Sequence, residues 1–132
     1  MEEYLMAKRF TASDKWEDPW FRKLPATSKL FWLFIIDRCD IAGVWKTDYG
    51  LASFCIGKTI DKSILAAFED RVEPFNGNKL WIMRYVEFQY TMLREDCTMH
   101  KAVINLLAKY DLLDRVMAGL VPGYPEKHKK SG

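Results

Sequence analysis

The chain has 132 residues, 49% of them hydrophobic and 14% aromatic, which allows one domain to bury an apolar core without disulfides or metals. Its apolar run Leu30–Ile36 is far shorter than the ~20 residues of a membrane span, and Met1-Glu2-Glu3 lacks the basic start of a secretory signal. The three cysteines are scattered without a disulfide framework. We therefore expect a cytoplasmic protein with free thiols and no membrane partner.

The first predicted helices lie before residue 40. Asp18 followed by Pro19 is typical of a helix start, because the aspartate caps the helix and the proline occupies its first position. In the next helix every residue of Leu30–Ile36 is apolar. A helix without a polar stripe is expected to be central, with other elements packed on most of its sides.

The segment Ile41–Tyr85 is the most informative part of the chain, because short β-rich and helical patterns follow one another in it. In chain order we expect a strand at Gly43–Trp45, helices at Asp48–Ile56 and Asp61–Asp70, and a hairpin of Val72–Phe75 and Lys79–Met83 closed by Asn76-Gly77-Asn78. This is the order of a winged helix-turn-helix, whose second helix enters the major groove of DNA. The predicted fold class is therefore α+β, mainly α with a small β-hairpin: a winged helix-turn-helix with additional N- and C-terminal helices.

Periodicity assigns inward faces to the two short helices of this segment. In the first helix, Leu51 and Cys55 are expected to face the core, with Phe54 as a further candidate. Gly57 is expected to end that helix in a left-handed conformation. In the second helix, spacing of i, i+4 and i+8 predicts a buried stripe of Ile60, Ile64 and Phe68.

The hairpin carries a tryptophan, Trp81, whose direction the pattern leaves open. It alternates with Leu80 and Ile82, so either Trp81 or its neighbours should face away from the core. A tryptophan exposed on the hairpin could touch a nucleic-acid backbone or a protein partner. Core packing is the other interpretation, because large rings fill volume in a small domain.

The carboxyl-terminal part predicts one long helix and a tail. Thr98 can cap a helix whose apolar spacing runs to Met117 and which Gly119 and Pro122 are expected to end. This helix is expected to pack back on the core. Beyond it the basic residues near the end predict a flexible tail. We thus expect a single winged-helix domain over residues 1–120 and a basic flexible tail over residues 121–132.

No catalytic or metal-binding pattern stands out. Gly57-Lys58-Thr59 is similar to the end of a phosphate-binding loop, but the glycine required five residues before the Gly-Lys step is absent. Cys97 and His100 have the spacing of a zinc ligand pair, but Cys39 and Cys55 are lone residues in apolar helical stretches. We expect a protein without enzymatic activity, metal or cofactor.

The charge balance of the central segment is nearly even, since residues 43–84 carry six basic and five acidic side chains. Phosphate neutralisation supplies most non-specific DNA affinity, so binding requires that the lysines converge on one face. Lysine and arginine would hold phosphates, and Ser63 is the candidate for a base edge. The residues expected to contact DNA are Lys46, Lys58, Thr59, Lys62, Ser63, Asn78, Lys79 and Arg84.

A series of core and turn residues runs through most of the chain, from about Lys15 to Leu113. It consists of Lys15–Leu24, Cys39–Trp45, Leu51–Phe54, Trp81–Tyr90 and His100–Leu113. This series resembles the amino-terminal winged-helix domains of phage replisome organisers and related replication-initiation proteins, and more distantly the DnaD-type primosomal domain. Because the matching positions are core and turn residues, the resemblance supports the fold more directly than the function.

The resemblance implies binding at a replication origin and assembly of a helicase or helicase loader, with no enzymatic activity in this domain. Proteins of this kind commonly continue into a linker and a partner-binding domain, whereas this sequence ends after a short basic tail. Our first hypothesis is a non-enzymatic module that binds double-stranded DNA in phage or bacterial replication initiation. The alternative is a protein–protein interaction or dimerisation module that uses its aromatic-rich helices and the face around Ala66, without direct DNA binding.

Overall fold

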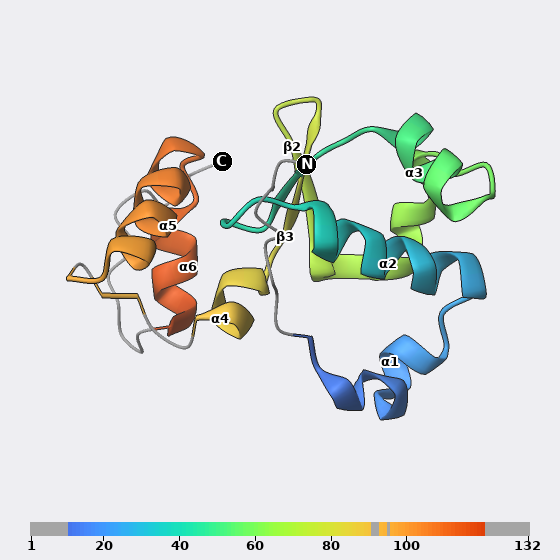
Figure 1. The fold of residues 1–132 in the computed structure, drawn as a ribbon, viewed down its shortest axis with the longest axis horizontal. Coiled ribbons are helices and arrows are strands. Elements are labelled where there is room, and N and C mark those ends of the chain that lie inside the picture. Colours follow the sequence, from blue (N-terminus) through green and yellow to red (C-terminus); the bar gives the residue numbers. More distant parts are fainter. Residues whose placement is uncertain (1–10, 91–92, 95, 121–132) are drawn as a thin grey trace, which may run out of the picture.

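The computed structural model describes residues 11–90, 93–94 and 96–120, which form a mainly helical α+β fold with one small sheet, as predicted (Figure 1). The predicted tail, residues 121–132, lies outside these residues. In chain order the elements are 3₁₀ helix η1 (Ser13–Glu17), α1 (Pro19–Arg22), α2 (Ala26–Arg38), β1 (Val44–Lys46), α3 (Tyr49–Ile56), 3₁₀ helix η2 (Lys62–Arg71), β2 (Val72–Phe75), β3 (Lys79–Ile82), α4 (Tyr85–Gln89), α5 (Thr98–Lys109) and α6 (Leu113–Leu120).

The three strands form an antiparallel sheet in the order β1-β3-β2, so the second hairpin strand is central. The hairpin turns at Asn76 and Gly77, whose φ angles of 52° and 77° suit the tight Asn-Gly turn that the sequence predicted. The predicted helix start at Asp18 is also confirmed, because its Oδ1 accepts a hydrogen bond from Trp20 N at 3.0 Å. Both features are set by residues adjacent in sequence.

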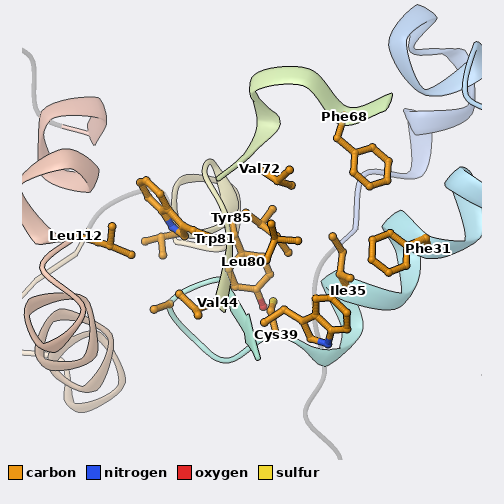
Figure 2. Close-up of a cluster of buried hydrophobic side chains, with 14 of the residues drawn as sticks. Phe31, Ile35, Cys39, Val44, Phe68, Val72, Leu80, Trp81, Tyr85 and Leu112 are labelled. Carbon is orange, nitrogen blue, oxygen red and sulfur yellow. The ribbon is translucent and has the colours of Figure 1, made fainter. Parts of the chain in front are cut away.

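Helices cover both faces of this sheet (Figure 1). On one face, the rings of Phe31 and Phe34 in α2 lie 5.5 and 6.1 Å from that of Trp45. On the other, Trp81 points toward Leu112, which precedes α6 (Figure 2). Since neither face is open, successive residues of β3 are all buried, with exposures of 0%, 3% and 4% for Leu80, Trp81 and Ile82. Trp81 is therefore a core residue.

The long apolar helix α2 is covered by other elements along most of its apolar run. Phe31 and Ile35 are fully buried, whereas Leu30 is 51% exposed. The sheet, α3 and η2 meet the side that carries Phe31, and the ring of Trp32 also contacts that of Trp20 in α1 at 5.1 Å. The other apolar residues of the run are partly buried against the core, namely Trp32, Leu33, Phe34 and Ile36. The expectation of a helix covered on most sides therefore holds, apart from Leu30. The ring of Phe68 in η2 stacks on that of Phe31 at 6.0 Å.

The second short helix is a 3₁₀ helix with a break, where we expected a regular helix. Asp61 begins it by accepting a hydrogen bond from Ser63 N at 3.0 Å, and Phe68 is fully buried as predicted. At Glu69 the backbone has a positive φ of 56°, and strand β2 starts three residues later. The break lets the chain turn directly from the helix into the hairpin.

The predicted long carboxyl-terminal helix is two helices, α5 and α6. They are separated at Asp111, which has a left-handed φ of 65°. Thr98 is the first residue of α5 and makes no side-chain cap, contrary to expectation. The break lets both helices pack against the sheet, so that Leu107 and Val116 are buried with 0% and 2% exposure.

Helix α3 has its apolar residues on the unexpected side. Phe54 is 86% exposed, Cys55 is exposed and Leu51 is half-buried, while Ala52 is fully buried. The predicted inward direction is therefore wrong for Cys55 and for the further candidate Phe54, while Leu51 lies at the boundary between core and solvent. Gly57 ends the helix with a φ of 89°, as expected.

Candidate nucleic-acid interface

Three of the predicted DNA-contacting residues meet at the hairpin end of the sheet. Lys46, the last residue of β1, lies directly opposite Lys79, the first residue of β3. Directly opposite residues of an antiparallel pair place their side chains on the same face, with Cβ atoms about 5 Å apart. Beside them, Lys79 Nζ lies 3.3 Å from the side-chain oxygen of Asn78. We call Lys46, Asn78 and Lys79 the hairpin group.

The turn that carries the hairpin group is fixed by Thr47. Its backbone N–H and its hydroxyl both donate to the carbonyl oxygen of Asn78, at 2.9 and 3.2 Å. Because these bonds link the chain after β1 to the chain before β3, they hold Lys46 and Lys79 in register. The predicted site did not include Thr47, although its position next to Lys46 places it in the same part of the chain.

The hairpin group has unbalanced positive charge. Like charges directly opposite each other on a sheet destabilise it. Among the described residues, the ion pairs are Arg84 with Glu87, Arg94 with Asp96 and Arg115 with Glu73. None of these carboxylates pairs with either lysine of the hairpin group, so an external anion placed between the two ammonium groups would relieve their repulsion.

A second set of predicted residues lies in and after the turn between α3 and η2. Lys58 and Thr59 follow the end of α3, and Lys62 and Ser63 open η2; all four are exposed. Figure 1 shows this turn, in green, away from the hairpin tip. We call these four residues the turn group.

The electrostatics of the turn group are mixed, because Asp61 lies inside it. Ser63 donates its hydroxyl to Asp61 Oδ1 at 2.6 Å, and its backbone N–H donates to the same atom at 3.0 Å. These hydrogen bonds lower the pKa of Asp61, so the carboxylate is charged at neutral pH next to Lys62. Ser63 could donate to a base edge only by giving up its hydroxyl bond to Asp61.

The last predicted residue, Arg84, is separate from both groups. It follows the other end of β3, and its Nε lies 3.3 Å from Glu87 Oε1 in an i,i+3 ion pair. Since each strand residue advances by about 3.3 Å, the length of β3 lies between Arg84 and Lys79. The eight residues thus lie in three places, and the structure brings together only those of the hairpin group and those of the turn group.

A hollow of about 670 Å³ lies between η1, α1, α2 and α4. Its lining includes the rings of Trp20 and Trp32, and the Arg71 guanidinium lies 3.9 Å from the Trp20 ring centre. Among the described lining residues, four carboxylates face three cationic groups, which are Asp14, Glu17, Asp18 and Glu87 against Lys15, Arg71 and Arg84. This balance does not suit a phosphate backbone, so the hollow is not the DNA site we consider.

The described part of the chain also bears on metal binding and on membrane spans. No group of three or more His, Cys, Asp or Glu side chains there could hold a metal ion. Cys39 is buried in the core and Cys55 is exposed on α3. His100 accepts a hydrogen bond at Nδ1 from Arg94 N at 3.1 Å. Within the same residues, no helix is long and apolar enough to cross a membrane.

Comparison of the chain with protein-family models, curated protein sequences and solved structures found no significant match. The described residues define a mainly helical α+β domain with a three-stranded antiparallel sheet. Its candidate interface consists of the hairpin group and the turn group.

Proposed function

We propose that this chain is a non-enzymatic winged-helix module that binds duplex DNA. The order of helix, strand, two short helices and hairpin, with the strand β1 paired to β3, supports a winged-helix interpretation. In this interpretation η2 is the element offered to the major groove and the β2–β3 hairpin is the wing. The irregular 3₁₀ geometry of η2 favours phosphate contacts over the reading of bases by a regular helix.

The observation that carries the proposal is the pairing of Lys46 with Lys79. Two lysines directly opposite each other at the end of the sheet cost stability, and an anion bound between them would offset that cost. A nucleic-acid backbone supplies closely spaced phosphates, and neutralising them releases counterions and favours binding. Asn78 adds a polar side chain next to the two lysines.

Lys58, Thr59 and Lys62 of the turn group would provide a second set of contacts to phosphates. Asp61 beside them reduces their contribution, because its carboxylate repels the backbone. Lys46 and Lys79 are therefore expected to account for more of the salt dependence than Lys58 and Lys62. We propose Ser63 and Arg84 only as peripheral contacts, because each is already bonded to a carboxylate.

The biological setting that we propose is initiation of phage or bacterial DNA replication. It follows from the resemblance of Lys15–Leu24, Cys39–Trp45 and the later segments to replisome organiser domains. In this setting the partners would be duplex DNA and a helicase or helicase loader. The DNA-binding proposal does not depend on this setting.

The test is fluorescence anisotropy of labelled duplex and single-stranded DNA across a salt series. Replacing Lys46 and Lys79 by alanine should weaken duplex binding and lower the slope of log affinity against log salt by about two. The matched control is K23A/K101A, which removes the same charge from exposed positions at the end of α1 and on α5. An unchanged slope in K46A/K79A would remove the hairpin group from the interface.

The alternative is a protein–protein interaction module without direct DNA binding. It is favoured by the balance of six basic and five acidic side chains in residues 43–84. Ala66, which we expected on the interaction face, is exposed on η2. Absence of saturable duplex binding even at low salt would decide for this alternative.

A further inference from the structure

The outer face of α3 carries no polar side chain. The helix contains no charged residue, and its two polar side chains, Tyr49 and Ser53, lie on the core side with the buried Ala52. At 100° per residue the opposite side is formed by Gly50, Leu51, Phe54 and Cys55. Phe54 is 86% exposed and is the most exposed large apolar side chain of the described residues.

Hydrogen bonds of Ser53 fix this orientation. Its hydroxyl donates to the carbonyl oxygen of Tyr49 at 2.7 Å and accepts from Ile60 N at 2.8 Å. Rotating α3 to bury Phe54 would break the bond to Ile60 and move Ser53 into solvent. The exposure of Phe54 is therefore built into the packing of the helix.

A helix that is apolar on all sides is normally covered on all sides. An isolated exposed apolar residue is ordinary, but here Phe54 has Leu51 and Cys55 beside it on the same turn and Gly50 one turn earlier. The exposed surface of α3 is thus one continuous uncharged patch, which we call the α3 patch: Gly50, Leu51, Phe54 and Cys55.

Charges of opposite sign bracket this patch. Asp48 caps the start of α3 and Lys58 follows its end; both are exposed, and each is five residues from Ser53. Two copies of α3 packed antiparallel would place Asp48 of each copy near Lys58 of the other. This arrangement also aligns the two helix dipoles favourably. A parallel arrangement would instead place like charges together.

We propose that the α3 patch binds a second copy of this chain through antiparallel packing of the two α3 helices. Along the sequence, the α3 patch is centred between Ala52 and Ser53, and the pair Asp48 and Lys58 is centred on Ser53. Because the two centres nearly coincide, one two-fold axis can serve both the apolar and the charged contacts. A two-fold axis there places Phe54 of each copy opposite Leu51 of the other. It also places Gly50 opposite Cys55, and a side chain at Gly50 would meet only Asp48 Oδ1, 3.6 Å away.

This self-association does not require DNA, although it would engage one lysine of the turn group. The patch is small, so the dimer belongs to the weak end of protein interfaces and should form at roughly micromolar to 100 micromolar concentration. Lys58 would then face Asp48 of the second copy, which leaves Lys62 as the free lysine of the turn group. The Ala66 surface takes no part in this contact.

Sedimentation equilibrium of the full chain across this concentration range tests the proposal. The apparent mass should rise from 15.5 kDa toward twice that value. F54S should remain monomeric with an unchanged circular dichroism spectrum. The matched control is F88S, since Phe88 on α4 is 50% exposed and lies outside the patch; it should associate like the unmodified chain. A chain that stays monomeric throughout, or F54S that associates normally, would overturn the proposal.

A second experiment does not depend on the folding of F54S. G50C should form a disulfide-linked dimer under mild oxidation, because the substituted position faces Cys55 of the other copy. In a C55S background the same substitution should give no cross-link, since the two positions 50 then lie at opposite ends of the interface. Equal cross-linking in both backgrounds would exclude the antiparallel arrangement.

Discussion

Tyr110 donates a hydrogen bond to Asp40 at 2.5 Å, which joins the end of α5 to the turn before β1 across seventy residues of sequence. The same carboxylate accepts from the backbone N–H groups of Ala42 and Val44 through its other oxygen, at 2.9 and 3.0 Å. One acidic side chain therefore shapes the entry to the sheet and anchors the carboxyl-terminal helices.

Removing the hydroxyl in Y110F should lower the free energy of unfolding by about 1–2 kcal/mol, because a hydrogen bond to a charged acceptor is lost. Urea denaturation at pH 7 measures this change. Y49F is the matched control, since the Tyr49 hydroxyl has no hydrogen-bond partner within the described part of the chain. Equal effects of Y110F and Y49F would contradict a specific role of the bond.

The Tyr110 bond also predicts a pH dependence. Burial, together with the bond to Asp40, raises the pKa of Tyr110 to about 12, above its ordinary value of 10.0. The folded state thus favours the protonated phenol. The contribution of Tyr110 to the free energy of unfolding is therefore fully present below pH 10 and is lost as pH rises toward 12. The difference in stability between the unmodified chain and Y110F should shrink across this interval.

Gly43 should tolerate no side chain. Its φ is 87°, and a Cβ there would lie 2.7 Å from Tyr85 Cβ. We expect G43A to lower the free energy of unfolding by at least about 2 kcal/mol, from backbone strain and from the displacement of α4. G77A is the control, because Gly77 has a φ of 77° but open space around it; its cost should be only about 1 kcal/mol.

The lysine pair predicts opposite effects on stability and binding. K46E places a carboxylate opposite Lys79 and should raise the free energy of unfolding by several tenths of a kcal/mol to about 1 kcal/mol at low salt. DNA affinity should fall at the same time. K46Q should be intermediate in both urea denaturation and anisotropy. If stability and affinity changed in the same direction, the pair would have no special role in anion binding.

The ion pair of Arg115 with Glu73 should contribute little at neutral pH. Arg115 donates two hydrogen bonds, at 2.9 and 3.1 Å, but both side chains are about 40% exposed. The pair lowers the pKa of Glu73, so its contribution is present above the ordinary value of 4.5 and is lost as pH falls below it. A double-mutant cycle of E73Q and R115M should give less than about 1 kcal/mol at pH 7.

Apart from the Thr98 cap, features that depend on neighbouring residues were predicted well, and features that depend on tertiary packing were predicted poorly. The Asn76-Gly77 turn, the Asp18 cap and the Gly57 helix end depend on neighbouring residues, and the structure confirms all three. The direction of α3 depends instead on the bond between Ser53 and Ile60. The pattern of apolar residues could not predict this direction, because it would place Phe54 in the core and Ser53 in solvent.

The break between α5 and α6 and the arrangement of the candidate interface also depend on tertiary packing. Asp111 breaks the carboxyl-terminal helix without glycine or proline, so no local pattern indicated it. The sequence identified the lysines of the hairpin and turn groups, but their separation depends on how α2 and η2 pack. The opposition of Lys46 and Lys79 required the register of β1 on β3, which two distant segments set together.

Because both faces of the sheet are buried, the chain cannot be shortened after the last strand without exposing part of its core. A fragment ending after α4 would contain every strand, yet it would leave Trp81 and Val44 without the cover of Leu112 and the helices around it. The side chains of the central strand β3 are therefore fully buried only after α5 and α6 have packed against the sheet. During synthesis we therefore expect the hairpin to become fully ordered only after α6 has emerged from the ribosome.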